Sequence, residues 1–100
     1  MEKNAPHCRL SFVKALVKDD KVRATASAFG GARELGISDL SGMCAVVMAL
    51  THACFYKSMT THADHHIWQD VYHTETAHGD PVYLKLTVIN DLLIVSFKEL

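Results

Sequence analysis

The chain has 100 residues, of which 49% are hydrophobic and 21% charged, so we expect one small globular domain over residues 1–100. Ten Lys and Arg residues nearly balance eleven Asp and Glu residues, which excludes a strongly basic nucleic-acid-binding protein but allows a local basic site. No apolar run is long enough to cross a membrane and the N-terminus is too polar for a signal peptide, so a cytoplasmic protein without membrane contact is expected.

Three helices are expected in the first half of the chain. The first follows Pro6 and ends at Asp19. The second covers residues 25–35, where two adjacent glycines weaken the pattern by about 1 kcal/mol each relative to Ala, and Gly36 is a suitable stop. The third starts near residues 38–39, where Ser and Asp are both favourable N-caps. Their apolar stripes predict core packing, by Leu10, Val13, Leu16, Val17, Met43, Val46, Val47 and Leu50.

The second half of the chain is expected to form strands, because the hydrophobic period changes from 3.6 to 2 after Thr51. Two strands are predicted at residues 55–60 and 67–73, and a hairpin at 82–98 with Asn90 and Asp91 as its two-residue loop. The predicted fold class is therefore α+β, with N-terminal helices packed on one face of a C-terminal antiparallel sheet.

The hairpin loop predicts a register in which Ile89 lies opposite Leu92 and Tyr83 lies opposite Lys98. One face is then entirely apolar and is expected to pack against the helices. It carries Val82, Leu84, Leu86, Val88, Leu93, Val95 and Phe97. The other face is polar away from the turn and apolar near it; it carries Tyr83, Lys85, Thr87, Ser96 and Lys98, then Ile89, Leu92 and Ile94.

The two preceding strands can be divided into faces in the same way. The first is expected to place Phe55, Lys57 and Met59 together, and the second Ile67, Gln69, Val71 and His73. Three aromatic residues lie at the alternate positions of these strands, on the face opposite Lys57 and Gln69, and are expected to be core residues rather than a base-stacking platform, namely Tyr56, Trp68 and Tyr72.

The polar hairpin face places a phenol and an ammonium on directly opposed residues, Tyr83 and Lys98, with Cβ atoms about 4.5–5.5 Å apart. A lysine there can hold a phosphate, and a tyrosine can position a group or transfer a proton. Taken alone, the pattern favours side chains that simply face water on an open sheet.

A histidine-rich segment is the other unusual feature, with His62, His65, His66, His73 and His78 close together. Imidazoles beside Asp64 suit a transition metal, but a loop imposes no ligand geometry, so an exposed loop without metal is favoured. His73 differs because it ends a strand on the Gln69 face, where it could transfer protons. None of the three cysteines forms a Cys-x-x-Cys pair, and buried, inert thiols are expected. No metal ion or cofactor is predicted.

Several blocks of the chain resemble one known family, and they extend from residue 2 to 99. They are EKNAPHCRL, KVRATASA, GMC, FYKSMTTHADHHIWQDVY and VYLKLTVINDLLIVSFKE, and they are similar to the motility quorum-sensing regulator (MqsR) toxins. The resemblance implies a fold like that of the RelE-like bacterial ribonucleases. It also implies a ribosome-independent mRNA interferase, the toxin of a type II toxin–antitoxin pair, cutting mRNA at GC-containing triplets, GCU above all. We further expect this cleavage to need no metal ion.

The family's active-site residues match four positions here: the Lys of FYKSM is Lys57, the Gln of IWQDVY is Gln69, the Tyr of VYLK is Tyr83 and the Lys of SFKE is Lys98. Three further residues on the same faces are expected to help bind substrate: Met59, His73 and Lys85. The chain departs from the family at His73, where an Arg is common, which replaces a permanent charge by a titratable ring.

The resemblance also implies a partner, a zinc-containing antitoxin that represses transcription. Any zinc would belong to that partner, and no DNA binding is expected without it. Two other functions remain open: a catalytically weak module that binds the antitoxin and modulates repression, and a metal-dependent hydrolase built on residues 62–78.

Overall fold

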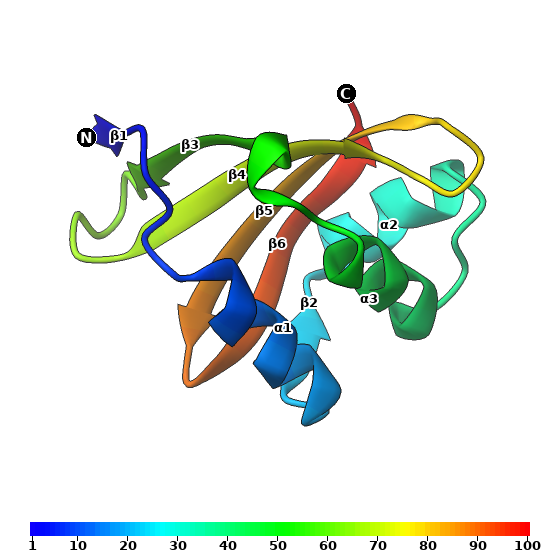
Figure 1. Ribbon diagram of the computed structural model, residues 1–100, viewed down its shortest axis with the longest axis horizontal. Helices are drawn as coiled ribbons and strands as arrows, with labels where there is room; N and C mark the ends of the chain where they lie inside the picture. The colour runs from blue at the N-terminus through cyan, green and yellow to red at the C-terminus, as the bar shows by residue number, and fades with distance from the viewer.

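The computed structural model describes residues 1–100 and has the predicted α+β fold, with three α-helices and a six-stranded sheet (Figure 1). The elements in chain order are β1 (Glu2–Lys3), α1 (Leu10–Lys18), β2 (Val22–Ala24), α2 (Ala26–Glu34), α3 (Leu40–Met48), the 3-10 turn η1 (His52–Cys54), β3 (Phe55–Thr60), β4 (Trp68–Glu75), β5 (Pro81–Ile89) and β6 (Asp91–Glu99).

The three helices begin and end close to the residues that the sequence predicts. The Asp39 side chain caps α3 by accepting a 2.8 Å hydrogen bond from the Gly42 N–H, and Thr25 caps α2 in the same way through Ala28. Gly36 follows α2 with φ of +80°, a conformation in which glycine is favoured because it has no Cβ.

The sheet order is β1-β3-β4-β5-β6-β2. Neighbouring strands are antiparallel except β2 and β6, which are parallel, so the prediction of a purely antiparallel, C-terminal sheet was incomplete. The two N-terminal edge strands have only two and three residues, too few for a periodic pattern to reveal them.

All three helices pack against one face of the sheet (Figure 1), around a single cluster of 16 buried residues. Each predicted apolar stripe contributes to this cluster, with Val13, Met43 and Val47 at most 2% exposed. The sheet face opposite the helices is therefore free of covering elements, and the candidate site lies there. None of the helices is long and apolar enough to span a bilayer.

The hairpin register is correct at one end and wrong at the other. Tyr83 lies opposite Lys98, as predicted, but a bulge beside Lys85 shifts the rest by one residue, so Asn90 alone makes the turn with φ of +65°. Leu92 and Ile94 are consequently buried against the helices, whereas the predicted core residues Leu93 and Val95 are only half-buried.

Pairing with β2 explains this shift. Val22 and Ala24 lie opposite Leu92 and Ile94, and the Thr25 hydroxyl donates a 2.8 Å hydrogen bond to the carbonyl of Val95, the bulged residue. The bulge adds one residue, so that the apolar side chains on both sides of it face the helices. A register counted outward from the turn cannot detect it.

A second bulge, between Phe55 and Lys57 in β3, overturns two further predictions. Phe55 lies opposite Tyr72 and packs edge-on against it, on the helix side, instead of sharing a face with Lys57. Tyr56 is 54% exposed, so it is not a core residue. Tyr72 is a core residue, with its pKa raised by burial to about 12, and Trp68 is half-buried with Lys3 Nζ 4.1 Å from its ring centroid.

The N-terminal segment is held against β4 by Asp70, which is 5% exposed. Its carboxylate accepts hydrogen bonds from the backbone N–H groups of His7 and Cys8, both 3.0 Å, and from the Ser58 hydroxyl at 2.6 Å. These bonds anchor the segment that leads to β1, and β1 in turn brings Glu2 to the edge of the candidate site.

Candidate active site

One face of the sheet gathers all seven residues predicted from the sequence. Four adjacent strands supply them, because side chains of one parity share a face. They are Lys57 and Met59 from β3, Gln69 and His73 from β4, Tyr83 and Lys85 from β5, and Lys98 from β6. The register aligns them in three short rows across the strands: His73–Tyr83–Lys98, then Lys57–Val71–Lys85–Ser96, then Met59–Gln69.

The first row joins a phenol and an ammonium. Lys98 Nζ lies 5.1 Å from the centroid of the Tyr83 ring, within range of a cation–π contact. Tyr83 is half-buried and Lys98 exposed, so both the phenol and the ammonium can reach a ligand lying on the face.

The second row holds two lysines on either side of Val71, which is fully buried although it faces away from the helices. The methylene chains of the two flanking lysines can cover the Val71 side chain while their ammonium groups remain in water. Lys85 is half-buried, and its pKa is lowered by burial first and then by the positive charges of Lys98 and Lys57.

The charged form of Lys85 is less stable in the folded protein than in the unfolded chain, so protonation of Lys85 lowers the free energy of unfolding. The penalty is fully present below the pKa of Lys85 in the folded protein, falls as the pH rises above that pKa, and is gone only above the higher pKa of a lysine in the unfolded chain. We therefore expect Lys85→Met to raise the melting temperature at pH 7 by roughly 2–4 °C, after allowance for solvent screening. Calorimetry over a pH series should show the difference shrinking at high pH. The exposed Lys18→Met is the control, and an equal shift there would contradict the explanation.

Lys57 is held by a residue that the sequence did not suggest. Its Nζ lies 2.6 Å from Oε1 of Glu2, and this hydrogen bond raises the pKa of Lys57 and lowers that of Glu2. Lys57 is thereby kept charged and its ammonium is oriented over the face. The sequence did not indicate a role for Glu2, because no pattern in it predicts that β1 pairs with β3.

The third row places Gln69 opposite Met59 at the end of the face nearest the histidine-rich loop. Gln69 is half-buried and shares its face with Val71, two residues further along β4. Its amide can donate and accept hydrogen bonds, and the Met59 side chain beside it offers an apolar surface. This row therefore adds neutral polar and apolar contacts to a face otherwise dominated by positive charge.

An aromatic group crosses the same face. The rings of Tyr56 and His73 are stacked with centroids 4.1 Å apart and an interplanar angle of 17°, and the His73 ring lies 5.9 Å from that of Tyr83. His73 thus packs between two tyrosines. Tyr56 was missed because strict alternation along β3 assigns it to the core; only the bulge turns it outward.

The remaining histidines and the cysteines form no comparable group. In the loop, the Asp64 carboxylate lies 3.1 Å from the His66 ring nitrogen, and no three His, Cys, Asp or Glu side chains of residues 1–100 are placed to share a metal ion. The three cysteines are free and half-buried rather than fully buried. Burial raises the pKa of the Cys8 and Cys44 thiols, whereas a hydrogen bond with Thr51 lowers that of Cys54.

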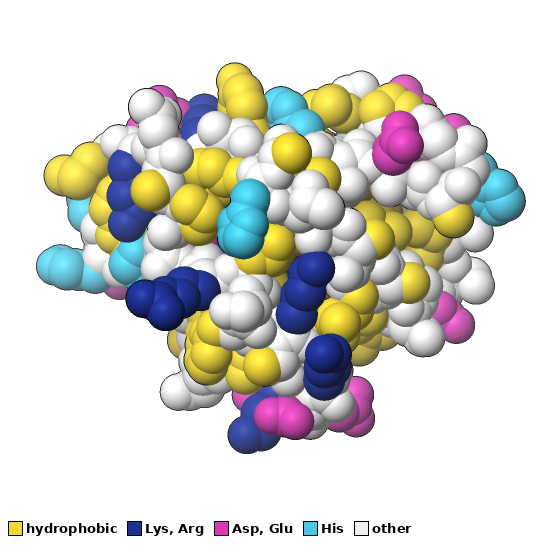
Figure 2. Space-filling model, in the orientation of Figure 1, with side chains coloured by type: hydrophobic (Ala, Val, Ile, Leu, Met, Phe, Trp, Pro, Cys, Tyr) yellow, Lys and Arg dark blue, Asp and Glu magenta, His cyan; other side chains and the backbone are white.

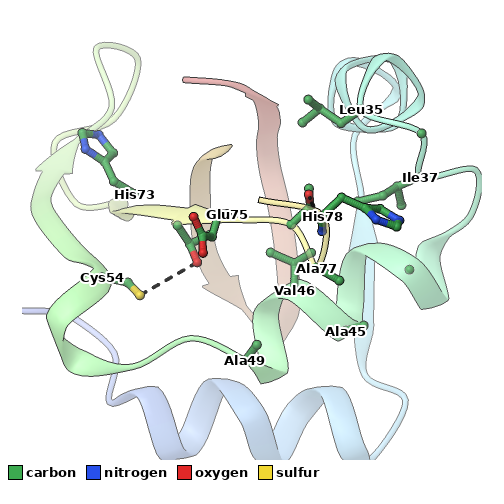
Figure 3. A pocket seen from close by; sticks show the side chains of 14 residues that line it. Leu35, Ile37, Ala45, Val46, Ala49, Cys54, His73, Glu75, Ala77 and His78 are labelled. Atoms are coloured by element: carbon green, nitrogen blue, oxygen red, sulfur yellow. Dashed lines mark hydrogen bonds between the residues drawn. The ribbon is translucent and has the colours of Figure 1, made fainter. Parts of the chain in front are cut away.

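A groove of about 850 Å³ lies on the helix side of β4 (Figure 3). The Cys54 thiol lies on this side, whereas the His73 side chain projects to the opposite side of the strand. Small and apolar residues such as Ile37, Val46 and Ala49 line it, and Figure 2 shows apolar surface in the hollow beside α3. No lysine or arginine lines the groove, so the basic, phenolic chemistry belongs to the open sheet face.

Two comparisons with known proteins match nearly the whole chain. A family model described as "Motility quorum-sensing regulator, toxin of MqsA" matches residues 5–99. The curated protein "mRNA interferase toxin MqsR" of Escherichia coli (strain K12) is 59% identical over 99 residues, which is 99% of this chain and 99% of that protein.

Proposed function

The chain belongs to the family of the motility quorum-sensing regulator toxins and is a toxin with mRNA-cleaving activity, and from this premise we propose that it cuts single-stranded mRNA at GC-containing triplets, GCU above all, without a metal ion or the ribosome. The observation that carries the proposal is the exposed face on which Tyr83, Lys98, Lys57 and Lys85 converge. Positive charge and a phenol on an open surface suit a phosphodiester.

RNA supplies its own nucleophile for such a cleavage. The 2′-oxygen attacks the adjacent phosphorus while the bond from phosphorus to the 5′-oxygen breaks, which leaves a 2′,3′-cyclic phosphate and a 5′-hydroxyl. A base takes the proton of the 2′-hydroxyl, and an acid gives one to the leaving oxygen. In our proposal Lys57 and Lys98 stabilise the negative charge on the phosphate, and Tyr83 and Gln69 orient the reacting groups.

Two residues can accept the proton from the 2′-hydroxyl. Lys85 is half-buried and repelled by two other lysines, so it gives up its own proton more readily than an isolated lysine and can then act as a base. His73 lies in the same row as Tyr83 and is the second candidate. In our proposal Tyr83, which lies beside both, donates a proton to the leaving oxygen.

The decisive experiment is cleavage of a synthetic RNA with a single GCU triplet, in EDTA and without ribosomes. We expect full activity and a product whose 5′ end accepts phosphate directly from a polynucleotide kinase. The matched control carries a 2′-deoxy sugar at the nucleotide that supplies the nucleophile, and it should stay intact. Activity that is lost in EDTA and restored by a divalent metal would instead support the hydrolase built on residues 62–78.

The antitoxin partner follows from the family, which is described as the toxin of MqsA. We propose that this partner contains the zinc and the DNA-binding surface, and that both proteins act in the cytoplasm, where mRNA is translated. An intact complex with the antitoxin combined with no cleavage of any RNA would favour the alternative, a binding module that modulates repression.

A further inference from the structure

Tyr56 is an exposed aromatic residue that neither the core nor the proposed chemistry uses. Its side chain is 54% exposed, although a tyrosine at this position in regular alternation would be buried. The bulge in β3 turns Phe55 into the core against Tyr72 and turns Tyr56 onto the face that carries Lys57. Tyr56 therefore offers an aromatic ring to a ligand on the same face as the lysines.

The orientation of the Tyr56 ring is set by its neighbours. One side of the ring stacks on His73, with centroids 4.1 Å apart and planes within 17° of parallel, and His73 in turn packs beside Tyr83. Three adjacent strands therefore contribute one ring each to a row. His73 stacks on one side of the Tyr56 ring, and with 54% of the residue exposed much of the ring surface remains accessible to a planar ligand.

The charges around this row define what kind of ligand it suits. Lys57 Nζ lies 5.7 Å from the centroid of Tyr56, and Lys85 and Lys98 lie 5.9 Å and 5.1 Å from that of Tyr83. A ligand that places a flat ring on Tyr56 thus brings any attached anion beside three lysines. A nucleotide has both parts, a base with an aromatic face and a phosphate.

We propose that Tyr56, backed by His73, is a stacking site for an unpaired base of the RNA next to the cleaved linkage. This inference rests on the proposed function and adds a base-binding subsite to it. Stacking tolerates any base, so the site adds affinity and places the strand, while the choice of triplet depends on other contacts. His73 serves it as a positioning residue because its ring holds that of Tyr56.

Binding of an RNA that cannot be cleaved tests the site separately from catalysis. A GCU-containing oligonucleotide with 2′-O-methyl sugars is titrated by fluorescence anisotropy, at one fixed salt concentration, against the parent protein and Tyr56 variants. We expect Tyr56→Phe to bind within about twofold of the parent, and Tyr56→Ala to bind roughly 5- to 100-fold more weakly. Tyr56→Leu, which keeps apolar bulk without a ring, should resemble Tyr56→Ala.

An abasic series identifies the stacked base. Removing one base at a time from the oligonucleotide should weaken binding to the parent at several positions, and at one of them Tyr56→Ala should abolish the effect while leaving the others unchanged. Parental affinity in Tyr56→Ala, or an unchanged abasic profile, would overturn the inference. So would a loss confined to antitoxin binding, which would make Tyr56 a protein-contact residue. If the variants behave as expected but the parent cleaves no RNA, the stacking site stands and the proposed cleavage does not.

Discussion

Lys98→Ala and Tyr83→Phe are each expected to lower kcat/KM for a GCU-containing RNA by about 100-fold or more. Lys98→Ala removes a positive charge beside Tyr83, on the face proposed to bind the phosphate. Tyr83→Phe removes a single oxygen, so it tests the hydroxyl while leaving the ring against His73 and Lys98. Both side chains lie outside the core, so these losses should occur without loss of the fold.

Initial cleavage rates in EDTA, measured over a range of RNA concentrations, separate an effect on chemistry from one on binding. Substitution of a residue that acts in the transition state should lower kcat, whereas substitution of a residue that only binds RNA should raise KM. Lys18→Ala, an exposed lysine of α1, is the matched control for loss of charge and should keep the parental rate. Parental rates in both Lys98→Ala and Tyr83→Phe would refute the assignment of the site.

Gly31→Ala is expected to destabilise the protein by about 3 kcal/mol, which corresponds to a fall in melting temperature of roughly 12–24 °C. A Cβ on Gly31 would lie 1.9 Å from the carbonyl oxygen of Phe97 and 3.1 Å from the Cα of Lys98. Both are backbone atoms and cannot rotate away, so α2 must move off β6. The absence of a side chain at Gly31 is what allows this close approach.

The neighbouring glycine provides an unusually well-matched control. A Cβ on Gly30 would meet nothing within 4 Å, and Gly30 lies in the same helix. Gly30→Ala should therefore stabilise the protein by about 0.5–1 kcal/mol through helix propensity alone. Urea unfolding of both variants measures the difference, and equal effects of the two substitutions would contradict the packing argument.

Gly31 also links packing to function. Because the clash falls on Phe97 and Lys98, the residual folded fraction of Gly31→Ala should cleave RNA more slowly per folded molecule than the parent. Helix α2 supports the back of the strand whose other face carries Lys98. The site therefore depends on helix packing on the far side of the sheet.

Alternation predicted which candidate residues share a face, because it is a local property of a strand, whereas their choice as active-site residues came from the family resemblance. Lys57 and Met59, or Tyr83 and Lys85, are separated by two residues and must share a face wherever the strand is regular. The helices were predictable for a similar reason, since Asp39 and Gly36 act on the turns of chain beside them.

Only the tertiary structure decided where the two bulges and the two short edge strands lie, and which way the side chains beside them point. Tyr56 faces outward and Ile94 inward because one extra residue is inserted in β3 and in β6, and that insertion is favoured by contacts with other strands and with the helices. Glu2 reaches Lys57 across 55 residues of sequence through pairing of β1 with β3. Contacts between segments so far apart in the sequence stabilise the fold but leave no periodic pattern in either segment. The local pattern therefore specified which side chains of a strand share a face. Long-range packing specified where each strand departs from that pattern.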